Sequence, residues 1–295
     1  MLRRFDMYVP ENIDELLSYL DGHQSGVQLI ANGSDLINRI QRRQIEARVL
    51  VDLSGLTEFN YVKKENGTIR IGALTTIQDL ISSPVLERHY DVFRDVASKF
   101  GGPSIVNVAT VGGNICAASS SEDLIPVLLV LGARVRVRSM SGERVINLED
   151  FLIGKRKTAI HPNEVLVETL FNELEAQSAC AFEKIGMRNS LIIAFLNCSV
   201  CLKVGKGNKR IEEIKIAMNR VSGRIPARAK KTESELRGHP LTKEQLESAM
   251  TSLKSELQLT SDFRTGKEYR QDVGPVLFKR TLIKCSERLG EKLLV

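Results

Sequence analysis

The chain has 295 residues, of which 42% are hydrophobic and 26% charged, and these proportions exclude a disordered or fibrous protein. The net charge of +6 is too small for this length to indicate nucleic-acid binding, and no segment approaches the ~18 uninterrupted apolar residues of a membrane span. With no secretion signal at its start, the sequence predicts a cytoplasmic protein of roughly two domains.

Residues 1–55 predict a strand and a helix followed by a small βαβ-like unit over about 27–53. The expected elements are a strand over 3–10, a helix over 11–22, a buried strand over 27–31, a short helix, and a strand near 49–53. Asn12 would cap the first helix, with Glu15 three residues on, and Gly22 would end it. The pair Asn32-Gly33 breaks the buried strand.

Residues 56–175 predict a longer mixture of strands and helices. The expected elements are a strand over 69–71, a helix that begins near Thr75 or Thr76, a helix over 91–100, a glycine-containing stretch over 110–126 that leads into an apolar helix, and a strand over 134–138. In that last strand Arg134, Arg136 and Arg138 share one face, and Val135 and Val137 share the other. The basic face is either solvated or a surface for a partner.

The composition of the elements changes after about residue 175. Strands over 191–204 and 211–223 are joined by a hairpin-like turn at Gly205–Asn208, and helices follow over 227–238, 242–257 and 273–294. We place the boundary between Asn172 and Phe182. The predicted domains are 1–175, with subdomains of about 1–55 and 56–175, and 176–295.

The cysteines predict buried structural residues and no metal site. They are odd in number and scattered, at Cys116, Cys180, Cys198, Cys201 and Cys285, which does not suggest a disulfide framework. Cys198 and Cys201 form a C-x-x-C, but a three-residue offset in a strand points the two side chains to opposite faces. The four histidines show no ligand spacing with each other or with cysteine.

Two short stretches could bind an anion through the main chain. Ala31–Asp35 and Thr110–Asn114 are expected to be strand-terminating loops that combine glycine or asparagine with a small hydroxyl residue. Neither contains lysine or arginine, so two such loops could hold the charges of a dinucleotide pyrophosphate by backbone N–H groups alone, or they could be plain turns. The sequence contains no P-loop, no Rossmann fingerprint and no nucleophile elbow, and we predict no catalytic acid or base.

Four strings in the chain resemble one family in order and spacing. They are LIANGSDLI, GGPSIVNVATVGGNICAASSSEDLIPVLLVLGA, FEKIGMRNSLIIA and TGKEYRQDVGPVLFKRTL. The likeness, which runs to about residue 285, is to the FAD-binding medium subunit of the molybdenum hydroxylases, the relatives of xanthine dehydrogenase, carbon monoxide dehydrogenase and aldehyde oxidoreductase. The linked pair A-x-G-[ST]-[DE]-L and T-x-G-G-N…D-L-x-P carries most of its specificity.

The resemblance implies an α+β protein. Its FAD-binding domain would have two subdomains of the vanillyl-alcohol oxidase-like (PCMH) type, and a C-terminal domain of the carbon monoxide dehydrogenase flavoprotein type would combine a β-sheet with helices. The residues implied to wrap the FAD pyrophosphate and ribityl chain are Leu29, Ile30, Ala31, Asn32, Gly33, Ser34, Asp35 and Leu36, with Thr110, Val111, Gly112, Gly113 and Asn114.

Four further positions match residues that lie near the cofactor in the family. Asp123 would accept a hydrogen bond from a cofactor hydroxyl, although an acid in the first turn of a helix is also stabilised by the helix dipole. Phe100 would lie near the isoalloxazine and Leu166 would pack on the cofactor. Lys184 would stabilise negative charge on the reduced ring, or it could be a solvated lysine.

The sequence departs from the family pattern at two places. Asn32 stands where many members have glycine, and asparagine is the non-glycine residue that best tolerates the left-handed conformation. Ser104 stands where relatives often have arginine, which puts a partner contact there in question. The four-cysteine iron–sulfur insertion of some relatives is absent, so we predict no cluster in this chain.

The resemblance implies an electron-transfer subunit of a larger complex. A large molybdopterin subunit would oxidise the substrate, a small [2Fe-2S] subunit would pass electrons on, and FAD on this chain would hand them to an external acceptor. A dimer of heterotrimers would be a possible assembly. Two alternatives remain open at this point: a stand-alone flavin-dependent reductase and a cofactor-free basic interaction module.

Overall fold

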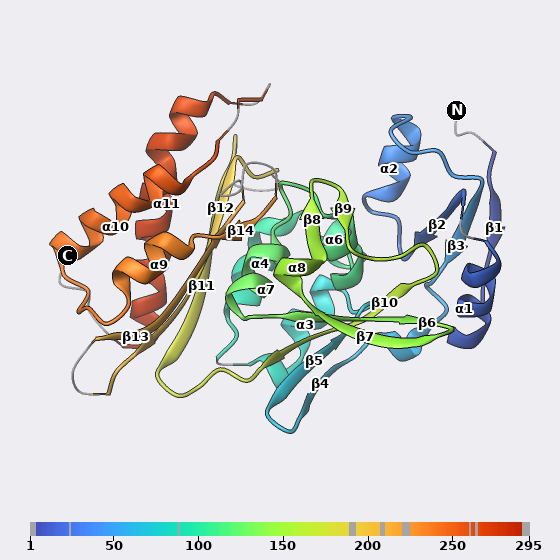
Figure 1. Ribbon diagram of the computed structural model, residues 1–295, viewed down its shortest axis with the longest axis horizontal. Helices are drawn as coiled ribbons and strands as arrows, with labels where there is room; N and C mark the ends of the chain where they lie inside the picture. The colour runs from blue at the N-terminus through green and yellow to red at the C-terminus, as the bar shows by residue number, and fades with distance from the viewer. Residues whose placement is uncertain are drawn as a thin grey trace.

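The computed structural model describes residues 4–23, 25–87, 89–188, 193–206, 210–219, 225–259, 261–262 and 265–290. Figure 1 shows the N-terminal elements at one end of the molecule, the C-terminal helices at the other, and the central strands and helices between them. Among the helices of these residues, none is long and apolar enough to cross a membrane. Helices combine with one parallel sheet and with larger antiparallel sheets, which confirms the predicted α+β class.

The N-terminal unit is a three-stranded parallel sheet with two helices, which confirms the expected βαβ-like unit. Its elements are β1 (Asp6–Tyr8), α1 (Ile13–Gly22), β2 (Val27–Ile30), α2 (Leu36–Gln41) and β3 (Val49–Asp52), with strand order β1-β3-β2. Asn12 caps α1 as expected, because its side chain accepts from the backbone N–H of Glu15 at 2.9 Å. Leu16, Leu17 and Leu20 are buried on the face of α1 that packs on the sheet.

The central unit is built on a five-stranded antiparallel sheet. The strand order is β4-β5-β10-β6-β7, formed by β4 (Val62–Glu65), β5 (Thr68–Gly72), β10 (Val165–Asn172), β6 (Arg134–Ser139) and β7 (Gly142–Asn147). In β6 the predicted alternation is confirmed, since Val135 and Val137 are fully buried. The arginine face is neither merely solvated nor free: Arg136 bonds Glu143 at 2.9 Å and lies 3.5 Å from the buried Glu168.

Short helices connect the strands of this sheet and pack against it or against the C-terminal strands. They are η1 (Thr57–Phe59), α3 (Ile77–Ser82), η2 (Pro84–Leu86), α4 (Val92–Phe100), α5 (Pro103–Val106), α6 (Val111–Ala117), α7 (Leu124–Val130) and α8 (Leu148–Phe151), followed by the hairpin β8 (Leu152–Gly154) and β9 (Lys157–Thr158). Every residue of α7 is buried. A helix that is apolar on all sides must be covered on all sides, and α7 packs between the central unit and the C-terminal sheet.

The stretch expected to be a glycine-containing loop is a helix N-terminus instead. Thr110 caps α6 by accepting from the N–H of Gly113 at 3.1 Å. A Cβ at Gly112 would lie 2.8 Å from the carbonyl oxygen of Ala73, so this glycine lets α6 approach the chain that leaves β5. The loop prediction for residues 110–114 is therefore wrong, because close packing here compensates for the low helix propensity of two glycines.

The C-terminal unit has the predicted sheet-plus-helices form. Antiparallel strands in the order β11-β12-β13-β14 are β11 (Ser178–Ile185), β12 (Leu196–Val204), β13 (Ile211–Met218) and β14 (Ala227–Arg228), and the helices are α9 (Lys230–Leu236), α10 (Lys243–Glu256) and α11 (Lys267–Arg288). Figure 1 shows α10 and α11 on the outer side of this sheet. The expected turn at Gly205–Asn208 falls partly outside the described residues.

In the C-terminal unit, the start of the last helix differs from the prediction, and the orientation of two cysteines agrees with it. The last helix begins at Lys267 rather than 273, with Gly266 at its N-cap. It also runs through Pro275, which is buried. Proline removes one backbone hydrogen bond from a helix, and here packing offsets that loss. Cys198 and Cys201 do lie on opposite faces of β12: Cys198 belongs to the core beneath the helices, and Cys201 packs against the central core. The described residues contain no group of three or more histidine, cysteine or carboxylate side chains that could hold a metal.

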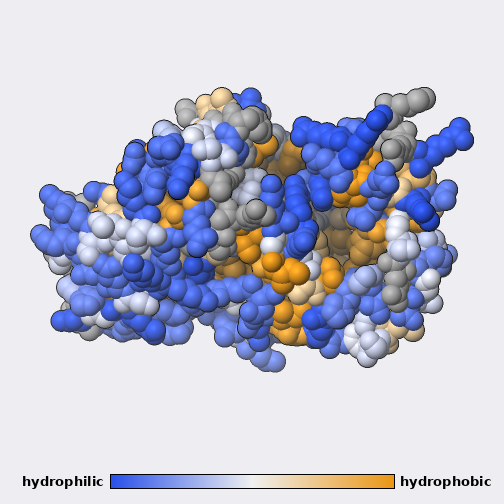
Figure 2. All heavy atoms as spheres, turned by 45° about the horizontal axis from the view of Figure 1, so that its top comes forward, coloured by the Kyte–Doolittle hydropathy of each residue, from blue (hydrophilic) through white to orange (hydrophobic). Residues whose placement is uncertain are grey.

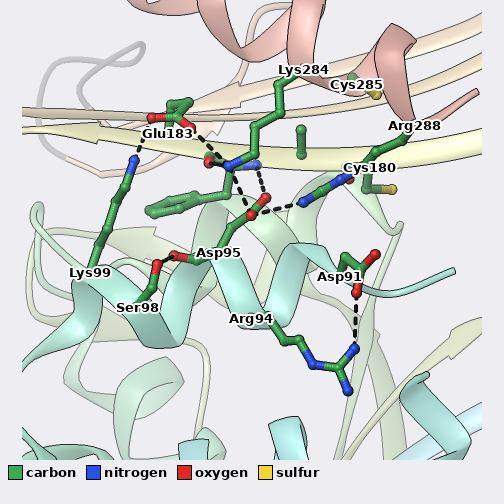
Figure 3. Close-up of polar contacts among 12 residues, drawn as sticks. Asp91, Arg94, Asp95, Ser98, Lys99, Cys180, Glu183, Lys284, Cys285 and Arg288 are labelled. Carbon is green, nitrogen blue, oxygen red and sulfur yellow. Dashed lines mark hydrogen bonds and ion pairs between the residues drawn. The ribbon is translucent and has the colours of Figure 1, made fainter. Parts of the chain in front are cut away.

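A cluster of charges ties α4 to the C-terminal unit. Asp95 on α4 accepts from Lys284 Nζ and Arg288 Nη2, both at 2.8 Å, and its other oxygen accepts from the backbone N–H of Phe182 at 3.1 Å. Figure 3 shows Asp95 between these two cations, with Glu183 bridging to Lys284 alongside. Only 10% of the Asp95 side chain is exposed. This carboxylate therefore joins three elements that are far apart in the sequence.

We predict that Asp95→Asn destabilises the protein by about 2 kcal/mol at neutral pH, because two partly buried cations lose their shared anion. Asp91→Asn, at the N-cap of the same helix, is the matched control: among the described residues the Asp91 side chain pairs only with Arg94, at 2.9 Å, and both side chains are exposed. Its loss should cost about 0.5 kcal/mol or less. Urea unfolding of both variants measures the difference. Equal losses would contradict the role given to Asp95.

Candidate functional site

A cavity of about 740 Å³ opens between the N-terminal and central units. Its walls come from β2 and α2, from the segment that includes α6, from the residues before α7, and from the β8–β9 hairpin and the start of β10. Figure 2 shows this face of the molecule hollowed between the two units, with hydrophobic side chains in the hollow. The volume lies within the range of small-molecule and cofactor sites.

The first wall is the turn between β2 and α2, and it offers main-chain donors. Gly33 adopts φ +73°, a left-handed conformation that glycine takes without strain. Within the part of the chain that the structure describes, no acceptor takes the backbone N–H groups of Asn32, Gly33 or Ser34. Three consecutive amide donors on a cavity wall form a concave site suited to an anion.

Asn32 has a different role from the one its residue type suggested. Its φ is not positive, so it is Gly33 that uses the left-handed conformation. The Asn32 side chain donates to the carbonyl oxygen of Val108 at 2.9 Å. This bond joins the first wall to the segment that leads into α6, so the two motif stretches, which are distant in sequence, lie on one cavity.

The second wall is α6, and its N-terminal amides are already bonded within the protein. The N–H of Val111 donates to Thr75 O at 2.9 Å, that of Gly112 to Ala73 O at 2.8 Å, and that of Asn114 to the Thr110 carbonyl at 2.9 Å. With Gly113 bonded to the Thr110 hydroxyl, this segment contributes shape rather than a row of free donors. Gly113, Cys116 and Ala117 lie one turn apart on the side that lines the cavity, where their small side chains leave room.

A buried ion pair lies at the start of α7. Asp123 Oδ2 bonds Lys184 Nζ from β11, and Asp123 Oδ1 accepts from Asn197 Nδ2 of β12 at 2.9 Å. Lys184 Nζ also donates to the carbonyl oxygen of Lys99 at 2.9 Å. Burial raises the pKa of Asp123, and the Lys184 ammonium and the Asn197 amide oppose that rise.

Arginines that the sequence did not single out bring positive charge to the cavity. Arg156, in the turn between β8 and β9, has φ +60° and contacts Asp35 at 2.7 and 3.2 Å. It also donates to the carbonyl oxygen of Ala117 at the end of α6, so one side chain connects both walls. Arg39 on α2 and Arg42, the C-cap residue of that helix, line the same cavity.

The structure brings almost all the predicted cofactor-binding residues together. All of them line the cavity except Val111, which is fully buried in the core, and Lys184, which lies behind Asp123. Phe100 ends α4, and Leu166 lies beside an irregularity in the pairing of β10 with β6. Cys116 is exposed in the cavity rather than buried as expected, because its helix face borders open space.

Two residues missed by the sequence reasoning occupy central positions, Glu122 and Arg156. Glu122 lines the cavity beside Asp123, and its Oε2 accepts from Asn114 Nδ2. A second acid next to the predicted one was the available signal. For Arg156 there was none, because its partner Asp35 is 121 residues away in the sequence.

Comparison with known proteins gives consistent matches along the chain. The family described as the FAD binding domain in molybdopterin dehydrogenase matches residues 3–171, and the CO dehydrogenase flavoprotein C-terminal domain matches residues 181–285. The nicotinate dehydrogenase FAD-subunit of Eubacterium barkeri is 28% identical over 98% of both chains. The putative xanthine dehydrogenase FAD-binding subunit of Escherichia coli is 29% identical over 90% of this chain and 91% of that one.

The fold agrees with that of a solved relative. A chain in the structure of carbon monoxide dehydrogenase from Hydrogenophaga pseudoflava superposes with a TM-score of 0.92 at 26% identity, and the match covers 98% of this chain and 99% of the other. The predicted order of an FAD-binding domain followed by a flavoprotein C-terminal domain is confirmed.

We predict that Lys184→Met costs about 3 kcal/mol of stability at pH 8, because it leaves the Asp123 carboxylate buried without its cation. The cost should be smaller at pH 5, since an unpaired buried carboxyl has a raised pKa and can take up a proton. The double variant Asp123→Asn/Lys184→Met removes both charges and should recover more than half of the loss. A pH-independent loss, or no recovery, would contradict the pairing.

Proposed function

Since this chain belongs to the family of FAD-binding domains of molybdopterin dehydrogenases, we propose that its cavity holds FAD and that the subunit passes electrons from a [2Fe-2S] partner to an external acceptor. The chain is an oxidoreductase flavoprotein subunit of the xanthine dehydrogenase family. We further propose a large molybdopterin subunit and a small [2Fe-2S] subunit as partners, a location in the cytoplasm, and a domain division near residue 175. FAD, when bound, supplies redox chemistry that links one-electron to two-electron steps.

One observation carries the cofactor assignment: the N–H groups of Asn32, Gly33 and Ser34, which have no acceptor among the described residues, lie on the wall of a cavity that Arg39 and Arg42 also line. A diphosphate offers oxygens to such donors and charge to the arginines, and charge-assisted hydrogen bonds are the strong ones. Because Gly113 has no side chain, the α6 face of the cavity leaves room for the ribityl group that joins the diphosphate of FAD to its ring. Arg156 holds Asp35 away from the diphosphate by binding both of its oxygens.

The other side of the cavity is suited to the flavin ring. Phe100, Ile105 and Leu166 give it apolar walls, and aromatic and aliphatic side chains exclude water from a planar ligand. Asp123 lines the cavity as an acceptor for a cofactor hydroxyl, but it does so as part of a pair with Lys184. Lys184 therefore acts on a bound ligand through Asp123, by holding that carboxylate ionised and in position.

We predict that Gly113→Val and Cys116→Phe both abolish FAD retention, because each side chain fills the cavity from the α6 face. Gly113→Val also disturbs the Thr110 cap, since a Cβ there would lie 2.7 Å from Thr110 Oγ1, whereas Cys116→Phe leaves the cap intact. Gly22→Val is the control, because Gly22 ends α1 and a Cβ at this position would meet no atom within 4 Å. The ratio of flavin to protein absorbance after purification is the measurement, and full flavin content in both cavity variants would contradict the site.

The role in electron transfer is tested on the protein purified from its native host. We predict that flavin, molybdenum and iron co-purify in constant ratio through successive columns, and that Cys116→Phe removes the flavin while molybdenum and iron remain. Flavin without either metal would instead support the stand-alone reductase. A colourless chain that binds nucleic acid in a steeply salt-dependent way would support the interaction module.

A further inference from the structure

Glu122 is a carboxyl group in the cavity that the proposed function does not use. It stands directly before Asp123, lines the cavity, and accepts a hydrogen bond at Oε2 from Asn114 Nδ2. Its Oε1 has no hydrogen-bond partner among the described residues, and Asn114 Oδ1 is buried without one. A side-chain amide thus fixes one oxygen of Glu122 and leaves the other for a ligand.

The two neighbouring acids have opposite surroundings. Asp123 has an ammonium group and an amide within hydrogen-bond distance, from Lys184 and Asn197. Among the residues that the structure describes, Glu122 has only the neutral Asn114 amide within that distance. Adjacent carboxyls with different partners can hold different protonation states at one pH, because only the paired one has a cation beside it that opposes the effect of burial.

The charged groups that face Glu122 do not cancel the effect of burial on its pKa. Arg156 from the β8–β9 turn and Lys184 from β11 favour its ionised form, and Asp35 before α2 and the neighbouring Asp123 disfavour it. Desolvation is the largest influence, and together these raise the pKa of Glu122 to about 8. The other titratable group on the α6 face is the Cys116 thiol, which is uncharged at neutral pH. Glu122 is therefore mostly a neutral acid at pH 7.

Building on the proposed function, we propose that Glu122 is a cofactor-binding residue that works only as a neutral acid: Asn114 fixes its Oε2, the free oxygen donates a hydrogen bond to an oxygen of bound FAD, and ionisation of Glu122 weakens FAD binding. The physical reason is that a protonated carboxyl is a donor, whereas a carboxylate only accepts. An anionic Glu122 would lose that bond. It would also add a negative charge to a cavity that must hold a diphosphate.

The pH dependence of FAD binding follows from the protonation of Glu122. If FAD binds only the form with neutral Glu122, the dissociation constant is flat below the Glu122 pKa and rises above it, becoming roughly tenfold larger at pH 9 than at pH 7. Replacing Glu122 by glutamine keeps a neutral donor of the same shape and removes the ionisation. Glu122→Gln should therefore bind FAD with little change between these two pH values.

The experiment is a titration of FAD into flavin-depleted protein, followed by flavin fluorescence at several pH values between 6 and 9.5. The wild type, Glu122→Gln and the control Glu58→Gln are compared, where Glu58 is an exposed acid in η1. The proposal expects about a tenfold rise of the dissociation constant with pH in the wild type and in Glu58→Gln, and a flat profile in Glu122→Gln. The same rise in all three proteins would overturn the inference and leave the FAD site standing. No FAD binding by the wild type at any pH would overturn both.

A second measurement needs no flavin. Because the carboxyl of Glu122 ionises at its ordinary value of about 4.3 in the unfolded chain but at about 8 in the folded protein, the native state is stabilised relative to the unfolded state at acid pH, and this contribution is lost as the pH rises through that range. The free energy of unfolding of the wild type should fall relative to that of Glu122→Gln between pH 5 and pH 8. A constant difference between the two proteins would mean that Glu122 is ionised in the folded state, which overturns the proposal.

Discussion

The buried ion pair between Asp123 and Lys184 fixes the floor of the cavity, formed by Glu122 and Asp123, against the C-terminal sheet. Asp123 begins α7, a helix whose residues are all buried, while Lys184 and Asn197 come from β11 and β12. Asn197 also donates to the Glu122 carbonyl at 3.0 Å, so two strands of the C-terminal unit hold the backbone on which both acids stand. Breaking one partner of such a pair leaves a charge in a medium that solvates it poorly, and the position of the cavity floor therefore depends on this contact.

The two walls depend on close backbone approach. Gly112 allows α6 to lie against Ala73, and the Asn32 side chain bonds Val108 from the opposite wall. Arg156 closes the arrangement by binding Asp35 on one wall and the carbonyl oxygen of Ala117 on the other. Backbone contacts, the Asn32 amide and the Arg156 guanidinium thus hold the two walls of the cavity in place.

The sequence predicted those features that depend on local chemistry. The Asn12 cap, the alternation in β6 and the opposite faces of Cys198 and Cys201 follow from periodicity and hydrogen-bonding capacity. The paired motifs predicted which segments line the cavity. Helix α6 was missed because two glycines lower helix propensity, and only the packing against Ala73 restores it. Arg156 could not be predicted, since its partners are brought to it by the tertiary fold.

The charges around the cavity explain why two adjacent acids need different states. Asp35 is held by Arg156 and lies 3.7 Å from Arg39, and Asp123 is held by Lys184. Each of these carboxylates therefore has a cation within ion-pair distance, whereas a third anion at Glu122 would have, among the described residues, only the Asn114 amide within hydrogen-bond distance. A ligand that brings two further negative charges makes that third anion more costly still, since like charges at short range in a poorly solvated site repel strongly. A cavity shaped for a diphosphate is thus more stable with Glu122 uncharged, and the Asn114 amide, which can hydrogen-bond the acid without supplying charge, is the partner that permits this state.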